Sequence, residues 1–289
     1  FFHPDPSVKR QSGLLQPEIN SSNTLGSSLT LPYYKVISNN KDITFTPTFF
    51  DGETSMLTTE FRAINENNKI FADVGYVNGY KSVTTNKTNN LSHYFLDIDH
   101  DLNFESYNSS NLKLSLKKVS NDTYLKVFDQ HITKSSLRPD DFDNLNSSLK
   151  LFLDHEDFDF ESGIQSFEDL QIKNKSDRYQ YNLPYYKYDR SISQIYFNGN
   201  LNFNSNGNNY LSSTNKLETN ITNNLTYNSL DYISNFGIKN NYSISLKNLN
   251  SLGKKTSQYK SSPQIELASL FNIDFSMPFE KKIRILKIF

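Results

Sequence analysis

The sequence predicts an all-β protein built as an antiparallel, up-and-down sheet. Apolar and polar residues alternate along most segments, which is the two-residue period of a strand with one greasy face and one wet face. Turn-forming residues separate these segments at nearly even intervals, and helical periodicity is weak. Without crossover helices, neighbouring strands must run antiparallel.

Three strands are expected in the first fifty residues, over Ser12–Asn20, Leu25–Ile37 and Lys41–Phe50. Each holds one proline, at Pro17, Pro32 and Pro47, so the prolines are spaced at equal intervals of 15 residues. Proline has no N–H, and it therefore interrupts the hydrogen-bond ladder wherever it lies within a strand. Because proline recurs in three successive strands, we expect these prolines to have a functional role at this end of the sheet.

Further strands bring the expected total to about 12–14. Two stretches are less regular: Asp122–His131 suits a strand or a short helical turn, and Tyr181–Tyr188 contains Pro184 and is expected to be irregular or an edge piece. Asp51-Gly52 and Asn206-Gly207 predict hairpin turns. The other expected strands are Ser55–Ile64, Ile70–Tyr76, Leu91–Phe104, Leu112–Leu116, Leu149–Leu153, Asp157–Asp169, Ile195–Asn204, Leu217–Tyr227, Tyr232–Leu246 and Gln264–Met277.

Composition leaves two ways to bury the greasy face. Hydrophobic residues make up only 36% of the chain while aromatics reach 14%, a balance that suits sheets with one wet face. Such a sheet either packs on another as a sandwich, here a soluble glycan-binding one, or closes into a barrel whose greasy face meets lipid. Strands of about ten residues with Asn, Asp, Lys and Ser opposite the apolar positions favour the membrane barrel with a wet lumen.

The sequence offers no chemistry for an enzyme. A net charge of −1 without a basic patch argues against a nucleic-acid partner, and the absence of cysteine removes disulfides and thiolate ligands. The acidic run Asp97–Asp101 lacks the glycine and terminal glutamate of a calcium loop. The acidic face of Asp154, Asp157, Asp159 and Glu161 either binds divalent cations, which accompany phosphate groups, or is a solvated lumen or loop, and we favour the solvated face. We therefore predict no catalytic residue, no metal site and no cofactor.

Four segments resemble the start of the barrel domain of the LPS-assembly protein LptD family, also called OstA or organic solvent tolerance protein. They read VKRQSGLLQP, LGSSLTLPYY, KDITFTPTF and LTTEFR, and they place the resemblance over Ser7–Arg62. A looser likeness covers Phe160–Tyr188, and after Gly199 only the strand rhythm continues it. Many family members join their domains through cysteines, and this chain has none.

The resemblance implies a transport function in the Gram-negative cell outer membrane. Family barrels have about 26 antiparallel strands, so this chain would be a fragment of about half a barrel. Residues 1–11 would link a missing periplasmic jellyroll domain to the barrel portion at 12–280, and 281–289 would be a truncated or out-of-frame end. The implied partners are an LptE-like lipoprotein plug, periplasmic LPS bridge proteins that act through the jellyroll, lipopolysaccharide and outer-membrane lipid.

The prolines suggest how lipid would leave such a barrel. Pro17 and Pro32 remove ladder bonds where first and last strands should meet, which would weaken the seam into a lateral gate. The predicted gate residues are Pro17, Pro32, Ser12, Gly13, Leu14, Leu15, Tyr33 and Tyr34. The alternative is that the prolines only start strands or mark bulges, and that the barrel is a generic outer-membrane channel or receptor.

Overall fold

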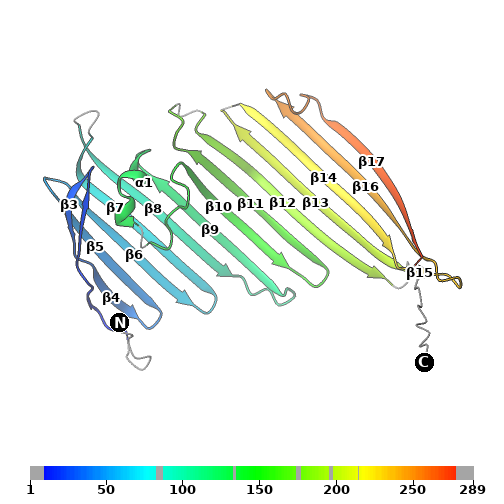
Figure 1. The fold of residues 1–289 in the computed structure, drawn as a ribbon, viewed down its shortest axis with the longest axis horizontal. Helices are drawn as coiled ribbons and strands as arrows, with labels where there is room; N and C mark the ends of the chain where they lie inside the picture. The colour runs from blue at the N-terminus through cyan, green and yellow to red at the C-terminus, as the bar shows by residue number, and fades with distance from the viewer. Residues whose placement is uncertain are drawn as a thin grey trace, which may run out of the picture.

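The computed structural model is a single antiparallel sheet, curved across its width (Figure 1). It describes residues 10–82, 87–132, 135–173, 177–194, 198–213 and 215–277. Strands pair in the order of the chain, from β1 and β2 at one edge to β17 at the other. The all-β, antiparallel fold class predicted from the sequence is therefore confirmed.

Most strands are 10 to 16 residues long. The first four and β15 are shorter. The strands are β1 (Gly13–Leu14), β2 (Glu18–Ser22), β3 (Gly26–Thr30), β4 (Tyr33–Ser38), β5 (Lys41–Phe50), β6 (Ser55–Asn65), β7 (Asn68–Lys81), β8 (Thr88–Asp101), β9 (Ser109–Val119), β10 (Asn144–Asp154), β11 (Phe158–Asp169), β12 (Tyr179–Gln194), β13 (Gly199–Ser212), β14 (Lys216–Ser229), β15 (Tyr232–Ile233), β16 (Lys239–Lys254) and β17 (Gln264–Ser276).

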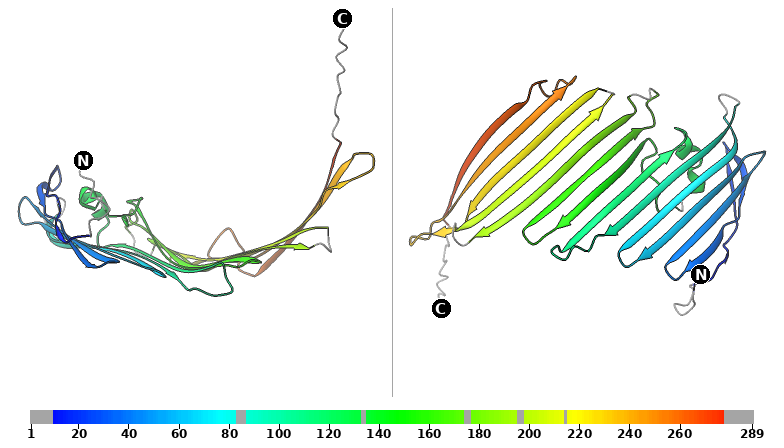
Figure 2. Two further views of the ribbon diagram at one scale, coloured as in Figure 1. Left: turned by 90° about the horizontal axis from the view of Figure 1, so that it is seen from below. Right: turned by 180° about the vertical axis from the view of Figure 1, so that it is seen from behind.

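The sheet remains open within the described residues. Strand β17 pairs with β16 on one side only, and the opposite edge is formed by β1 on β4 and by β2 on β3. Figure 2 shows the two edges standing well apart, with the sheet bent like part of a cylinder wall. In the part of the chain that the structure describes, no second layer of strands covers either face.

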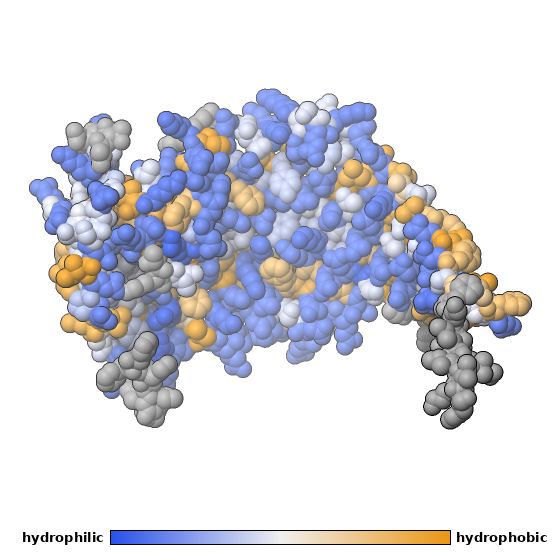
Figure 3. All heavy atoms as spheres, viewed as in Figure 1, coloured by the Kyte–Doolittle hydropathy of each residue, from blue (hydrophilic) through white to orange (hydrophobic). Residues whose placement is uncertain are grey.

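The two faces differ in chemistry. Figure 3 views the concave face, on which the short helix α1 lies, and most of that face is hydrophilic. Residues opposite one another in paired strands share a face, and following these pairs across the sheet assigns a series of exposed apolar residues to the convex face. They include Leu29, Phe49, Leu57, Val74, Tyr94, Leu116, Leu149, Ile164, Ile221 and Leu246.

Among the described residues, the hydrophobic core lies where the loop between β9 and β10 folds back onto the concave face. This loop forms the helices α1 (Tyr124–Val127) and α2 (Asp129–Ile132). Their buried residues pack on apolar positions of the wall: the cluster holds Phe50, Met56, Val77, Leu91, Phe95, Val119, Tyr124, Leu125, Phe128, Ile132, Leu137, Leu145 and Leu170. Within the described ranges, neither helix has the length or apolar character to cross a bilayer.

Tyr181–Tyr188 was expected to be irregular or an edge piece; the irregularity is confirmed, and the edge position is wrong. The segment lies inside the 16-residue strand β12, which pairs with β11 and β13 on its two sides. The sheet accommodates Pro184 by shifting register around it, between Gly163 and Gln165 on β11 and between Asn182 and Tyr185 on β12. A bulge of this kind lets a central strand skip the missing donor.

The hairpin predicted at Asn206-Gly207 is also wrong. Both residues lie in the middle of β13, where Gly207 stands opposite Tyr186 and Ile221. A Cβ atom on Gly207 would lie 2.3 Å from Cε1 of Tyr186. Glycine is therefore required here by the tyrosine ring packed over the backbone.

Other expectations differ in detail. Ser12–Asn20 and Leu25–Ile37 were each expected to be one strand, but each is split at its proline, because proline has no donor to continue the ladder. Tyr232–Leu246 is divided between β15 and β16 by a turn at Gly237. Asp122–His131 takes the helical alternative. Residues 1–9 of the predicted linker and the predicted end at 281–289 lie outside the described residues.

Candidate functional site

Pro17, Pro32 and Pro47 lie beside one another near one edge of the sheet. Pro17 lies between β1 and β2, Pro32 lies between β3 and β4, and Pro47 lies within β5. The backbone N–H of Leu15 donates to the Pro32 carbonyl at 2.8 Å, and that of Leu31 donates to the Pro47 carbonyl at 3.0 Å. Extending the pairing of Glu18 with Thr30 by one step places Pro17 opposite Leu31. The three residues that lack a backbone donor are thus gathered in one place.

The ladder at this edge is short and interrupted. Strand β1 pairs with β4 at two positions, Gly13 with Tyr34 and Leu14 with Tyr33, and β2 pairs with β3 at five. Gly13 pairs with Tyr34 before the break and Glu18 pairs with Thr30 after it, so five residue steps on one strand lie opposite four on the other. The strand that contains Pro17 therefore carries one extra residue as a bulge. By contrast, β6 and β7 pair without interruption at eleven positions.

The structure places all eight predicted gate residues along this edge. Gly13 and Leu14 form β1, directly opposite Tyr34 and Tyr33 of β4. Pro17 and Pro32 lie in the breaks of their strands, and Leu15 lies beside Pro32. Ser12 precedes β1, and its Oγ accepts the N–H of Val36 at 2.9 Å. The residues therefore form one continuous site in space.

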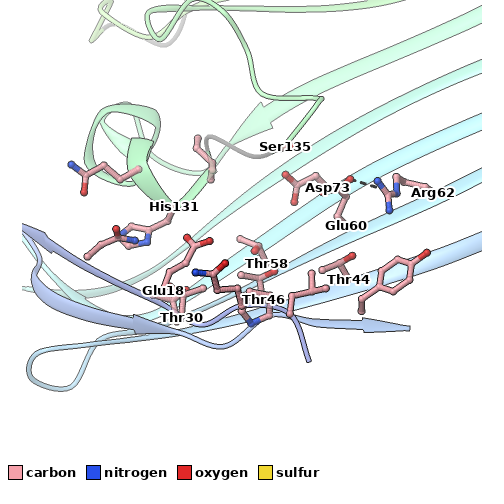
Figure 4. Close-up of a pocket in the computed structure, with 18 residues that line it drawn as sticks. Glu18, Thr30, Thr44, Thr46, Thr58, Glu60, Arg62, Asp73, His131 and Ser135 are labelled. Atoms are coloured by element: carbon pink, nitrogen blue, oxygen red, sulfur yellow. Dashed lines mark hydrogen bonds and ion pairs between the residues drawn. The ribbon is translucent and has the colours of Figure 1, made fainter. Parts of the chain in front are cut away.

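A cavity of about 540 Å³ opens on the concave face beside the proline breaks. Figure 4 shows it between the first strands and the loop that carries α2. Threonine hydroxyls line its wall, and Oγ1 of Thr30 and Oγ1 of Thr48 are 3.0 Å apart. The threonines are Thr30, Thr44, Thr46, Thr48 and Thr58. Such a wall offers hydroxyl groups to water or to the hydroxyls of a sugar.

Charged side chains occupy one end of the cavity. The Arg62 Nε lies 2.8 Å from Oδ1 of Asp42 and 3.8 Å from Oε1 of Glu60. Asp42 is 3% exposed, and its other oxygen is bound by Arg10, the described residue nearest the chain start. The two ionic partners offset the hydration that this buried carboxylate loses.

The helical loop closes the cavity on its other side through Gln130, His131, Ile132 and Ser135. The His131 ring stands edge-on to Phe50, with ring centroids 4.9 Å apart. Burial lowers the pKa of His131, because the charged imidazolium would lose its hydration there. This end of the loop is thus held by apolar packing that favours the neutral ring.

A buried polar chain joins the loop to the wall. The Tyr124 hydroxyl lies 2.8 Å from Nδ1 of His93, and Nε2 of His93 lies 3.1 Å from Oδ1 of Asp73. His93 and Tyr124 are fully buried, and burial raises the pKa of Tyr124. Gly75 makes the contact possible, because a Cβ there would lie 2.4 Å from Cε1 of His93.

Sequence reasoning did not foresee the cavity or the docked loop. The available signal was the spacing of Tyr124, Leu125, Phe128 and Ile132, which is the three-to-four-residue period of a helix. The acidic run around Asp97 and Asp99 forms ion pairs across the sheet with Lys117 and Lys113, at 3.4 and 3.5 Å. Across the described ranges, no acidic or histidine cluster has the arrangement of a metal site.

Several curated proteins are similar to this chain. An LPS-assembly protein LptD of Idiomarina loihiensis is 28% identical over 161 residues, covering 52% of this chain and 20% of the relative. Proteins of the same name from Cupriavidus necator and Shewanella frigidimarina are 27% and 24% identical, over 62% and 74% of this chain. The chain is thus similar to LptD proteins.

LptD proteins are much longer than this chain. The chain spans about a fifth to a quarter of the curated LptD relatives, with 20%, 21% and 26% of their lengths matched. No family model matches the sequence. The LptD relatives confirm the resemblance that the sequence shows to this family.

Proposed function

We propose that this chain forms part of the wall of an outer-membrane barrel that assembles lipopolysaccharide, and that its first-strand edge is the lateral gate. Lipid A would pass sideways between the first strand and the strand that completes the barrel, while the sugar chain occupies the polar interior. The observation that carries the proposal is the alignment of Pro17 and Pro32 at the edge, in a strand pair with only two ladder positions before the break.

The convex face supports a membrane location. Its apolar residues are exposed on strand after strand, and an exposed apolar surface of this extent suits contact with lipid. Near one end of the sheet, aromatic rings follow one another from strand to strand, with centroids 5.5 to 6.5 Å apart, in the manner of an interfacial girdle. The rings belong to Phe158, Tyr188, Phe203, Tyr227, Tyr242 and Phe271.

The energetics of the ladder support a gate. Each ladder bond stabilises the pairing by about 0.5–1.5 kcal/mol net, so two missing donors and a bulge remove a large share of what holds so short a strand pair. In hydrocarbon an unpaired backbone group costs several kcal/mol, and most barrel strands are therefore fully paired. At this edge both paired strands carry a proline at the break, which lowers the cost of separating them and suits a gate.

The concave face supports passage of a sugar. The cavity beside the gate is lined by threonine hydroxyls and bounded by Glu60 and Arg62, groups that hydrogen-bond to hydrated saccharides. Within this proposal, an LptE-like lipoprotein fills the lumen, and periplasmic bridge proteins deliver lipopolysaccharide through a jellyroll domain. Both partners rest on the family resemblance.

The test is to restore the missing donors. In a full-length protein containing this chain, Pro17→Ala with Pro32→Ala is expected to lower surface delivery of lipopolysaccharide, because the edge can then pair. The matched control is Pro47→Ala, in which the restored N–H faces Leu31 one strand further inside. Wild-type delivery by a folded double variant would count against the gate, as would an equal loss in the control.

A further inference from the structure

We infer that Arg10, Asp42 and Arg62 form an ionic clamp that holds the start of the first strand against the wall and sets how readily that strand detaches. The clamp deepens the proposed gate, and its consequence for transport rests on that proposed function. The contacts by which these side chains hold β1 in place do not depend on the proposed function.

The geometry centres on Asp42 of β5. Its side chain is 4% exposed, and it lies two strands in from the edge. Arg62 of β6 stands directly opposite and binds Oδ1 at 2.8 Å, while Arg10 reaches Oδ2 from the residues that precede β1. One buried carboxylate thus connects the residues that precede β1 to β5 and β6.

Arg10 crosses the second strand to reach this carboxylate. Its guanidinium lies 5.8 Å from the centre of the Tyr34 ring on β4, and Nη1 donates to the Asn39 carbonyl at 3.5 Å. Val36 of β4 pairs with Asp42 and donates its N–H to Oγ of Ser12. The side chains of Arg10 and Ser12 therefore replace the backbone ladder that β1 lacks below Gly13.

The exposed fractions of the three side chains indicate which of them can move. The Arg10 side chain is 47% exposed and the Arg62 side chain 39%, whereas Asp42 is enclosed. Arg10 can leave without opening the wall, because Arg62 still partners the carboxylate. Loss of the Asp42 charge releases both arginines at once. Arg10 is accordingly the movable arm and Asp42 the fixed anchor, and both are positioning residues for the strand.

The experiment measures the position of the strand directly. This chain has no cysteine. In the full-length protein, with any cysteine outside this chain replaced by serine, Leu14→Cys on β1 and Ile64→Cys at the end of β6 are spin-labelled, and the distance between the labels is measured by pulsed electron paramagnetic resonance. Asp42→Asn and Arg10→Gln are expected to raise the detached, long-distance population about threefold to tenfold, the effect of losing a partly exposed, charge-assisted pair.

The matched control is Asp97→Asn, which removes a carboxylate paired with Lys117 on β8 and β9, away from the edge. Unchanged distances in a folded Arg10→Gln variant would overturn the clamp. This variant also decides the matter if Asp42→Asn fails to fold. Longer distances together with wild-type lipopolysaccharide delivery would support the clamp and contradict the proposed gate, so the two failures are distinguishable.

Discussion

The backbone N–H of Leu31 donates to the carbonyl oxygen of Pro47 at 3.0 Å, at the point where the second strand of the sheet breaks. This bond joins the break at Pro32 to β5, which is unbroken and pairs with β6 without a register shift. The disturbance therefore ends at the third strand. The edge outside β5 is weakly paired, whereas β5 with β6 and β6 with β7 pair without a register shift.

Gly75→Ala is predicted to undock the helical loop from the wall. The new methyl group would lie 2.4 Å from the His93 ring and 3.0 Å from the Tyr124 hydroxyl, and overpacking of this kind costs about 1–3 kcal/mol. Faster trypsin cleavage after Lys126, in α1, is the expected result.

A matched control for this glycine is Gly13→Ala, because no heavy atom lies within 4 Å of a Cβ at Gly13. It is expected to leave cleavage in the loop unchanged. Equal cleavage of wild type and Gly75→Ala would show that the buried chain from Asp73 to Tyr124 does not hold the loop.

Docking of the loop is predicted to weaken at acid pH through His131. Burial lowers the pKa of this residue in the docked state, so below its ordinary value of about 6.5 the undocked state binds more protons. Stability of docking therefore rises with pH through that window and falls as the solution is acidified. Proteolysis of the loop between pH 5 and pH 8 measures it.

The variant His131→Gln isolates this contribution, since it keeps a polar side chain that does not titrate. The acid sensitivity of the loop should shrink in this variant. An identical pH profile in wild type and variant would assign the effect to other groups.

Gly207→Ala is predicted to destabilise the wall by about 1–3 kcal/mol, the range for overpacking a close contact. Its methyl group would meet the Tyr186 ring at 2.3 Å. The double variant with Tyr186→Leu should recover part of the loss, because the two residues act through one contact. Urea unfolding of the four proteins in the cycle measures the coupling. Additive losses would mean that the glycine serves another purpose.

Much of the sheet could be predicted from its sequence. The limits of β5 at Lys41–Phe50 agree with the alternation of apolar and polar residues, and β6 and β17 agree to within one residue. Alternation is visible because the two faces meet different surroundings, one apolar and one wet. The first edge was also identified, because three prolines at equal spacing leave a pattern in the sequence.

The features that the sequence did not predict depend on contacts between residues that are far apart in the chain. Pro184 and Gly207 have strong local signals for an edge and a turn, yet both lie in central strands because a bulge and a tyrosine ring accommodate them. The cavity and the clamp are equally invisible locally, since Arg10 and Asp42 are 32 residues apart and meet only after three strands have paired. Tertiary packing decides such positions.

The most direct test of the gate is photo-crosslinking of lipopolysaccharide in living cells. A photoreactive residue at Leu15, which is 47% exposed at the proline break, is compared with one at Ile164, which is 44% exposed on the convex face far from the edge. We predict that lipopolysaccharide adducts form at Leu15 well above those at Ile164, and only during active transport. Equal labelling at the two positions would contradict the account.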